Sequence, residues 1–525
     1  MEALFALEKE ALMRQHRMAA ITASGNSSIE RFYTGSTVFV TGGSGFVGKL
    51  LVEKLFRSCN VNKIFLLLRS KKDKNAQQRA NDILMDPIFD SLHKHKPEFV
   101  KNVLALEGNV SEVRLGLNSS DWNTLAEQVN IIFHVAATVN FDETIKKATL
   151  TNVRGTREIL HLARACKHLR SIVHVSTAYS HATKSRVDSA VKEQFYESPM
   201  PPNALIELAE NMDEKNLNSI VKKLMDDWPN TYSFSKALGE EIVRTEARNL
   251  PICIVRPAIV ISSYHEPMIG WIDPNNAYGA SGVILGIETG ILHTLKTKQE
   301  IVMSFVPVDI VVNTVIAAGW ETTKQRINED DIKIYNVTNN RSPMLWGDLS
   351  KVLNTDGRNL ASPRAIWYCF VIETTHEVVY LICTMLLHFI PAFFVDSACK
   401  LLNKKPILTK TYKKVYKLST VLTYYMTNGW KFQDDNVLKI YNNMSKNDQE
   451  VFNCDMATVD FRQLVVIWVF GIRKYIIKDD LLGTEQAIKR QFWLKIITFG
   501  IFCLYFYIFY KILIMICGTL VGFSV

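Results

Sequence analysis

A short β-branched run, a glycine-rich turn and an apolar helix follow one another near the start of this chain. The run Thr37-Val-Phe-Val-Thr41 has the composition of a buried strand, and a helical stretch begins after Gly48. Three glycines spaced three residues apart let the backbone turn tightly and approach a pyrophosphate at the helix amino terminus. A plain glycine turn is the alternative, but the flanking strand and helix favour a dinucleotide site. That site is predicted to use Thr41, Gly42, Gly43, Ser44, Gly45, Phe46, Val47 and Gly48.

Apolar runs of strand length alternate with helical stretches after this turn. They occupy residues 63–68, 103–106, 131–136, 172–176 and 252–256. Strands that alternate with helices form parallel sheets whose two faces are both covered. We therefore expect an α/β fold, a doubly wound parallel sheet of the Rossmann type, over residues 36–340.

Length and composition exclude several classes of protein. With 525 residues, of which 48% are hydrophobic and 22% charged, the chain is too long for one small domain and too apolar to be disordered. The net charge of +9 is mild and scattered, which argues against nucleic-acid binding and suits phosphorylated small molecules or an anionic membrane surface. The 9 cysteines form no C-x-x-C pair and no metal-ligand spacing, so we expect reduced thiols and no metal site.

Composition also predicts how the rest of the chain is divided. Residues 1–35 lack the apolar core of a signal peptide and contain a stretch rich in Ser, Gly and Asn, so we expect a flexible extension. Beyond residue 340, helical periodicity replaces the alternation of strands and helices, which predicts a mostly helical domain over residues 341–485. Nothing in the sequence indicates an oligomeric state.

The last segment, residues 490–525, is expected to associate with a membrane. Residues 496–525 are mostly apolar, with Lys511 as their only charge, and are long enough for a membrane-spanning helix. A charge near mid-membrane is costly, so a tilted span, a shallow hairpin and a span ending near Lys511 all remain open. A second apolar run, residues 378–395, fits a core helix and a membrane-surface helix equally well. The preceding chain is predicted to face the cytosol because of Lys489, Arg490 and Lys495.

The second predicted strand ends at Arg69, where a site for NAD would usually place an acidic residue. A basic residue there suits the 2′-phosphate of NADP, so Arg69 is predicted to select NADPH, helped by Lys71 and Arg79. A solvated charge run after a strand is the alternative. Further cofactor contacts are expected where the third and fourth strands end, from Asn109, Val110, Ala136, Ala137 and Thr138.

A phenol and an ammonium group four residues apart provide the candidate catalytic pair. Tyr232 and Lys236 share one face of a predicted helix, so Lys236 can bind the nicotinamide ribose and lower the pKa of the phenol. Tyr232 would then donate a proton to a carbonyl oxygen. Thr177, with Ser176 as its competitor, would hydrogen-bond that oxygen unless the hydroxyl only caps its own turn. Asn152 would hold a water or backbone group behind Lys236, or lie on a helix surface.

These motifs resemble those of the extended short-chain dehydrogenase/reductase superfamily. Across almost its whole length the chain more narrowly resembles the alcohol-forming fatty acyl-CoA reductases. Sugar-nucleotide epimerases and steroid dehydrogenases share only the first domain with that family. The matching stretches beyond the first domain are Trp367-Tyr368, Pro391-Ala392, Trp430-Lys-Phe432 and Gly471-Ile-Arg-Lys-Tyr475.

The resemblance implies reduction of long-chain acyl-CoA by NADPH to a primary alcohol, through an aldehyde, with a Thr/Tyr/Lys constellation. It also implies an endoplasmic reticulum or peroxisome membrane and adds Pro257 and Ile259 to the cofactor site. The family usually has Asp where this chain has Asn109, which puts the adenine contact in doubt. Ser44 and Ser235 replace a common Thr but keep the hydroxyl.

Three other functions stay open. The enzyme could stop at the aldehyde, or it could be an isomerising or steroid-type dehydrogenase, which would leave the helical domain unexplained. It could also be a catalytically silent, membrane-tethered NADP-binding scaffold. Retention of both Tyr232 and Lys236 argues against the scaffold.

Overall fold

The computed structural model describes residues 2–71, 73–276, 278–324, 332–479 and 481–522. The chain divides into two compact units. The first contains Met1–Asn276, Glu300–Trp346 and Tyr424–Gly471, and the second contains Ala277–Gln299, Gly347–Thr423 and Ile472–Val525. This division differs from the single boundary expected at residue 340. Residues 277–299 already belong to the second unit, and residues 424–471 belong to the first.

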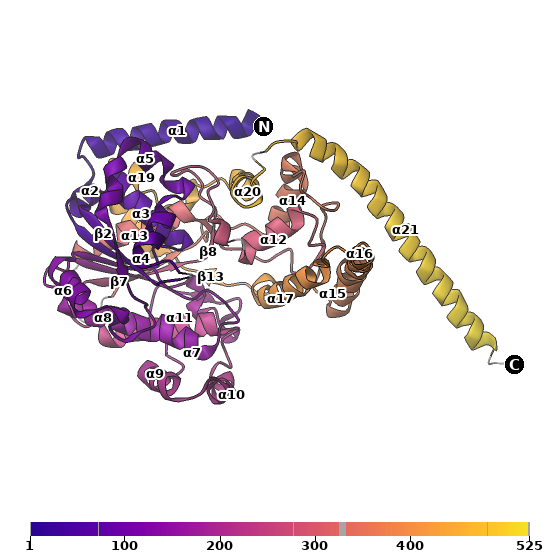
Figure 1. Cartoon of the computed structure of the whole chain (residues 1–525), viewed down its shortest axis with the longest axis horizontal. Coiled ribbons are helices and arrows are strands. Elements are labelled where there is room, and N and C mark those ends of the chain that lie inside the picture. Colours follow the sequence, from indigo (N-terminus) through magenta and orange to yellow (C-terminus); the bar gives the residue numbers. More distant parts are fainter. Residues whose placement is uncertain (1, 72, 277, 325–331, 480, 523–525) are drawn as a thin grey trace. The chain divides into compact units, whose positions relative to one another are not determined.

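A seven-stranded sheet forms the centre of the first unit, and all its strand pairs are parallel. The order is β11-β7-β5-β4-β1-β2-β3 (Figure 1). The strands β1, β4, β5 and β7 are buried throughout, as their apolar and β-branched residues predict. The bounds are β1 Thr37–Thr41, β2 Lys63–Leu68, β3 Val103–Glu107, β4 Ile131–His134, β5 Ser171–Val175, β7 Ile252–Pro257 and β11 Ile334–Val337. The predicted doubly wound parallel sheet is confirmed.

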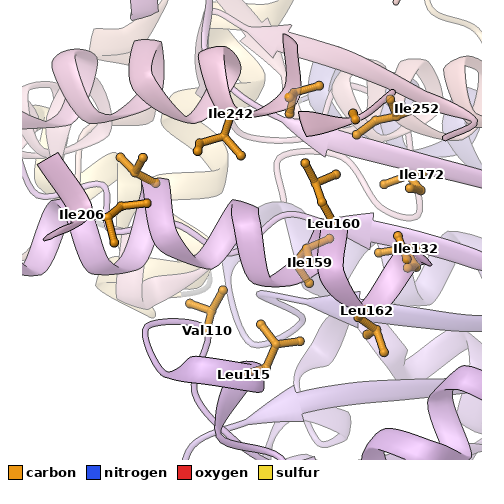
Figure 2. Packing of buried hydrophobic residues seen from close by; sticks show 14 of the residues in the cluster. Val110, Leu115, Ile132, Ile159, Leu160, Leu162, Ile172, Ile206, Ile242 and Ile252 are labelled. Carbon is orange, nitrogen blue, oxygen red and sulfur yellow. The ribbon is translucent and has the colours of Figure 1, made fainter. Parts of the chain in front are cut away.

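Helices cover both faces of this sheet (Figure 1). On one face α3 (Phe46–Ser58) packs beside α13 (Val308–Glu321), and on the other α8 (Gly155–Ala165) packs between α6 (Ser119–Gln128) and α11 (Thr231–Glu246). Figure 2 shows the core of the second face, where side chains from three neighbouring strands meet those of α8 and α11. The labelled residues there include Ile132, Ile172, Ile252, Leu160 and Ile242.

Smaller elements complete the first unit. Two strands of the upstream chain pair with strands much farther along: β8 (Ile259–Ile261) with β10 (Phe305–Pro307), and β6 (Ala190–Val191) with β13 (Lys431–Phe432). The pairing of β13 with β6 agrees with the place of Tyr424–Gly471 in the first unit. The remaining helices include α4 Ala76–Leu84, α5 Asp90–His95, α7 Ile145–Ala148, α9 Pro202–Asn211, α10 Glu214–Leu224, α18 Asp435–Asn443, α19 Lys446–Val451 and α20 Phe461–Gly471.

The amino-terminal segment differs from the flexible extension expected for residues 1–35. It forms α1 (Glu2–Ala23) and α2 (Ser28–Tyr33). Asp448 accepts hydrogen bonds from the hydroxyls of Ser27 at 2.5 Å and Ser28 at 2.7 Å, and the buried Tyr33 donates to a backbone carbonyl of α13. The polar residues before α2 therefore form an anchored turn, in which Ser27 caps the helix.

The second unit is mostly helical, with one short parallel strand pair, β9 (Thr294–Lys296) and β12 (Ile372–Thr374). Two of its helices, Glu377–Leu401 and Thr484–Met515, are long and apolar enough to cross a membrane. The second belongs to α21 (Thr484–Gly522), which contains the predicted membrane segment; residues 523–525 of that segment lie outside the described residues. Its other helices are α12 Gly279–Glu288, α14 Trp346–Thr355, α15 Glu377–Thr384, α16 Ile390–Leu401 and α17 Leu408–Thr427.

Candidate active site

The strand order places the glycine turn at a topological switch point. From β1 the chain builds β2 and β3 on one side and then β4 on the other, and ligands of such sheets bind at the carboxyl ends of these strands. Gly42 has φ +77°, and a Cβ there would lie 2.6 Å from the backbone N of Ala136. A Cβ at Gly48 would lie 2.1 Å from the carbonyl oxygen of Gly42. Only glycine fits both positions, so the turn can lie flat against the end of β4.

Helix α3 begins directly after this turn. Gly45 precedes its first residue, Phe46, and has no side chain that could cap the first N–H groups. Helix starts of this kind attract phosphate through their N–H groups and dipole. Thr41, Gly43, Ser44 and Val47 belong to the same strand, turn and helix start, as the sequence predicts.

The loop after β4 is fixed from two sides. The N–H of Ala136 donates to the hydroxyl of Thr41 at 3.3 Å, and the N–H of Thr138 donates to the side-chain oxygen of Asn152 at 3.0 Å. Asn152 lies in a π-helical turn, Thr149–Arg154, and also donates to the hydroxyl of Ser235 at 2.9 Å. Asn152 is buried, and it connects the loop containing Ala137 to helix α11.

Two guanidinium groups lie at the carboxyl end of β2. Arg69 is exposed, and Arg79 of α4 donates a hydrogen bond to the Arg69 carbonyl. Partial burial lowers the pKa of Arg79, and the positive charge of Arg69 lowers it further. Two neighbouring positive charges that repel each other favour a bound anion. Lys71 is exposed, and its backbone exchanges hydrogen bonds with the backbone of Lys74.

The side chain of Asn109, after β3, is occupied within its own turn. Its oxygen accepts from the N–H of Ser111 at 3.2 Å, and its NH₂ donates to Glu112 at 3.1 Å. The neighbouring Val110 is buried in the core cluster. The adenine contact predicted for Asn109 thus has to compete with these two local hydrogen bonds.

Helix α11 carries the candidate catalytic pair in its first turns. The side chain of Asn230 caps the helix by accepting from the N–H of Ser233 at 3.0 Å. Lys236 is buried, and its ammonium donates to the carbonyl of Val175, the last residue of β5, at 2.8 Å. Burial lowers the pKa of Lys236 to about 8, against the attraction of the Glu240 carboxylate. Tyr232 is half-buried, with its ring 5.7 Å from that of Phe141.

The two candidate hydroxyls after β5 have different partners. Ser176 donates to the buried carboxylate of Glu240 at 2.5 Å, whereas Thr177 makes a longer hydrogen bond of 3.3 Å to the carbonyl of Pro257. The hydroxyl of Thr177 also accepts from the N–H of Tyr179 at 3.2 Å. A short bond to an ionised group is the stronger one, so Thr177 is the hydroxyl more easily released to a ligand. Pro257 ends β7, and Ile259, the first residue of β8, is half-buried.

A buried ion pair behind these residues was missing from the sequence prediction. Glu240, one turn after Lys236, accepts hydrogen bonds from Arg256 at 2.5 and 2.9 Å, from Ser176 and Ser180, and from His181 at 3.1 Å. Burial opposes ionisation of Glu240, but Arg256 and His181 outweigh it and hold its pKa well below the usual range. An arginine inside the apolar run 252–257 is the signal that points to such a partner.

Aromatic residues from far along the chain also reach this site. The side-chain NH₂ of Asn230 donates to the hydroxyl of Tyr425 at 2.8 Å, and the Tyr425 ring lies 5.6 Å from Phe141 and 5.1 Å from Tyr179. Spacing along the sequence gives no sign of this contact, which spans 195 residues. Tyr425 thus joins the cap of α11 to the aromatic residues beside Tyr232.

Comparison with known proteins extends over almost the whole chain. Residues 40–315 match an NAD-binding family model described as "Male sterility protein", and residues 387–479 match a second model, Sterile, with the same description. The chain is 35% identical to fatty acyl-CoA reductase wat of Drosophila melanogaster over 93% of each chain. It is 34% identical to fatty acyl-CoA reductase 1 of Homo sapiens over 90% of this chain and 91% of that one.

Solved structures share the fold at low identity. The terminal R domain from the myxalamid PKS-NRPS biosynthetic pathway has a TM-score of 0.57 and 18% identity, covering 85% of this chain and 93% of that one. The reductase domain of a nonribosomal peptide synthetase from Mycobacterium tuberculosis has a TM-score of 0.56 and 18% identity, covering 85% and 92%. Together with the nucleotide-binding sheet, the family and sequence matches show that the chain belongs to the fatty acyl-CoA reductase family, oxidoreductases that use a nicotinamide cofactor.

Proposed function

We propose that the chain reduces long-chain fatty acyl-CoA to the primary alcohol with two equivalents of NADPH, through an aldehyde, and releases CoA. The observation that carries this proposal is the placement of Tyr232 and Lys236 on α11, with the Lys236 ammonium bonded to the end of β5. That end lies at the same edge of the sheet as the glycine turn after β1. The relatives named for acyl-CoA reduction supply the substrate class.

The residues at this edge fit a phosphorylated dinucleotide. The start of α3 and the close approach of Gly42 to Ala136 suit a pyrophosphate, and β1 and β2 are neighbours, so the guanidinium of Arg69 lies one strand away. Arg69 and Arg79 together suit a 2′-phosphate better than a bare hydroxyl pair. When bound, NADPH supplies the hydride for both reductions.

The side chains of the chain control the substrate oxygen. Thr177 and Tyr232 would hold the thioester oxygen while negative charge develops on it, and Tyr232 would donate its proton as hydride adds to the carbon. The Lys236 ammonium would bind the cofactor ribose and stabilise the phenolate. The hemithioacetal that results then loses the CoA thiol and becomes the aldehyde. Once the Tyr232 phenolate has regained a proton from water, the same three residues would serve the second reduction, with no acyl-cysteine intermediate.

Membrane association forms part of the proposal. From Phe506 to Met515 the residues of α21 are all exposed, and its apolar run suits insertion into a bilayer. The basic residues Lys489, Arg490 and Lys495 near the start of α21 favour a cytosolic catalytic unit. We propose a membrane of the endoplasmic reticulum or the peroxisome.

Product analysis tests this function directly. Membranes that carry the full chain are incubated with radiolabelled acyl-CoAs of different length and NADPH, and alcohol, aldehyde and free acid are separated by chromatography. We expect alcohol. Aldehyde as the final product would establish a one-step reductase, and no reduction of any chain length would favour the scaffold.

We expect Arg69→Glu to raise the KM for NADPH about tenfold to a hundredfold, because a charge-assisted hydrogen bond to the 2′-phosphate is lost and repulsion replaces it. The KM for NADH should change much less. The matched control is Lys74→Glu, the same charge change on the neighbouring turn, where Lys74 pairs with Asp82. Equal losses for NADPH and NADH, or an equal effect of the control, would show that Arg69 recognises no phosphate.

We expect kcat to fall as the pH rises through about 8, the pKa to which burial brings Lys236. Above that pH the ammonium that stabilises the tyrosine anion is lost. His134 and His174 do not cause this loss of activity at high pH, because burial holds the pKa of His134 well below its usual range and lowers that of His174 to about 3. In Lys236→Arg, the residual activity should not show this loss near pH 8; an unchanged loss would assign it to another group.

A further inference from the structure

One long helix of the second unit exposes apolar side chains along most of its length. Residues 377–401 form a continuous helix through α15, a π-helical turn and α16. Its buried side is a stripe at every fourth position, consisting of Tyr380, Thr384, His388, Ala392 and Asp396. The other sides are exposed or half-buried, with Phe393 at 65%, Phe394 at 66% and Leu401 at 87%. A core helix would bury such residues, so this segment needs a different apolar environment.

Helix α17 packs antiparallel along the buried stripe. The rings of His388 and Tyr412 stack at a centroid distance of 4.8 Å, and those of Tyr380 and Tyr416 lie 6.2 Å apart. At the other end of the stripe, Asp396 accepts hydrogen bonds from three backbone N–H groups at the start of α17, at 2.8 to 3.1 Å. The two helices therefore form one hairpin, residues 377–417.

The outer face of α17 carries the charges that decide how this hairpin meets a membrane. Lys410, Lys413, Lys414 and Lys417 are exposed, and their spacing places them on one side of the helix. Because Tyr412 stacks on His388, these lysines lie level with the middle of the apolar helix. If that helix crossed a bilayer, four ammonium groups would lie near the centre of the bilayer. Each of them would lower the equilibrium constant for insertion about a hundredfold. The helix is long enough to span, but its partner prevents it.

The tip of the hairpin combines apolar and basic residues. Leu401, Leu402 and Ile407 are 87%, 68% and 61% exposed, and the exposed lysines among them are Lys400, Lys404 and Lys405. Between Asp396 and Asp434 the sequence has no acidic residue. Apolar side chains that enter the acyl region beside lysines at the headgroups are typical of helices that lie in the membrane interface.

We propose that residues 377–417 form an interfacial hairpin that lies on the membrane without crossing it and docks through its tip onto an anionic bilayer surface. The lysines of the tip bind anionic headgroups, and the leucines, Ile407 and the phenylalanines enter the acyl region. This contact is additional to insertion of α21, whose Tyr505 donates a hydrogen bond to the Leu386 carbonyl at 3.1 Å. From Phe506 to Met515 the residues of α21 are exposed, so the hairpin lies where α21 leaves the body of this unit.

The first test measures topology in the full chain, reconstituted in sealed vesicles. Thr375→Cys and Lys405→Cys place a thiol at each end of the helix, and a membrane-impermeant polyethylene-glycol maleimide is added outside. Modification is read as an extra mass shift over the parent chain, which has 9 cysteines of its own. We expect both positions to react in the same vesicles, on the side of the catalytic unit. Reaction of one position only after detergent is added would show a span and overturn the proposal.

The second test measures the lipid partner. An environment-sensitive fluorophore on Leu402→Cys is followed in phosphatidylcholine vesicles with and without phosphatidylserine, with spin-labelled lipid as quencher. We expect quenching to increase with phosphatidylserine. Replacing Lys400, Lys404 and Lys405 by Gln should lower the docked fraction about tenfold or more. The matched control replaces Lys215, Lys222 and Lys223 of α10, which are also exposed.

Reductase activity in detergent serves as the reference in both tests and should be unchanged in all these variants, so failure of the hairpin proposal is distinguishable from failure of the proposed function. A label that stays in water with either lipid would overturn docking. Quenching that is equal with and without phosphatidylserine and unaffected by the three lysine substitutions would overturn the anionic partner.

Discussion

Tyr232→Phe is expected to abolish alcohol formation, with a loss in kcat of about a hundredfold to ten-thousandfold, the usual contribution of a positioned general acid. The substitution removes only the hydroxyl, so the ring keeps its contact with Phe141 at 5.7 Å. The N–H groups at the start of α3 and the guanidinium of Arg69 are untouched. The Kd for NADPH, measured by fluorescence titration, should therefore stay within about twofold of the parent value, as expected for a group that acts mainly in the transition state.

The matched control is Tyr179→Phe, which removes a phenolic hydroxyl from the same aromatic surroundings. Burial raises the pKa of Tyr179, and its ring lies 5.1 Å from Tyr425, so it contributes packing and carries no assigned chemistry. We expect kcat to change less than about threefold, since a single neutral hydrogen bond contributes little. Turnover by Tyr232→Phe at the parent rate, or an equal loss in both variants, would contradict the assigned proton donor.

The sheet and its glycine turn could be predicted because their signals are local. A buried parallel strand needs a short apolar run, and the run Thr37–Thr41 is buried at every position. The glycine spacing acts in the same way, because the positive φ of Gly42 and the contact of a Gly48 Cβ with the Gly42 carbonyl both arise within the turn. The helix that carries Tyr232 and Lys236 could be predicted from a local signal too, the spacing of four residues that places both side chains on one helix face.

Residues whose partners are remote in the chain could not be predicted in this way. Tyr425 meets Asn230 only because Tyr424–Gly471 return to the first unit. The turn before α2 is polar, as a flexible linker would be, and only its bonds to Asp448, about 420 residues away, make it an anchored turn. Composition records polarity but does not record which distant group satisfies it.

Glu240→Gln is expected to lower the free energy of unfolding by about 3–5 kcal/mol, the usual cost of breaking a buried ion pair by removing one partner. The substitution keeps the shape of the side chain but leaves the Arg256 guanidinium, which is fully buried, without its counter-charge. Urea denaturation of the full chain in detergent, at matched protein concentration, measures the difference. The matched control is the adjacent Glu241→Gln, whose partner Arg244 is half-exposed and whose ion pair should contribute at most about 1 kcal/mol.

The dependence on pH gives a sharper reading of the same pair. Arg256 and His181 hold the folded-state pKa of Glu240 well below the value of about 4.3 that it has in the unfolded chain. A depressed pKa contributes stability above the unfolded value, and that stability is lost as the pH falls through the folded value. The difference in the free energy of unfolding between the parent chain and Glu240→Gln should therefore be constant from pH 8 to 5 and shrink only below about pH 4.

A difference below about 1 kcal/mol at neutral pH would mean that the carbonyls of Lys192 and Gln194, at 3.1 and 3.0 Å, suffice to hold Arg256. The amide oxygen in Glu240→Gln would still accept from Ser176, so Thr177 would remain the hydroxyl that is more easily released to the substrate oxygen.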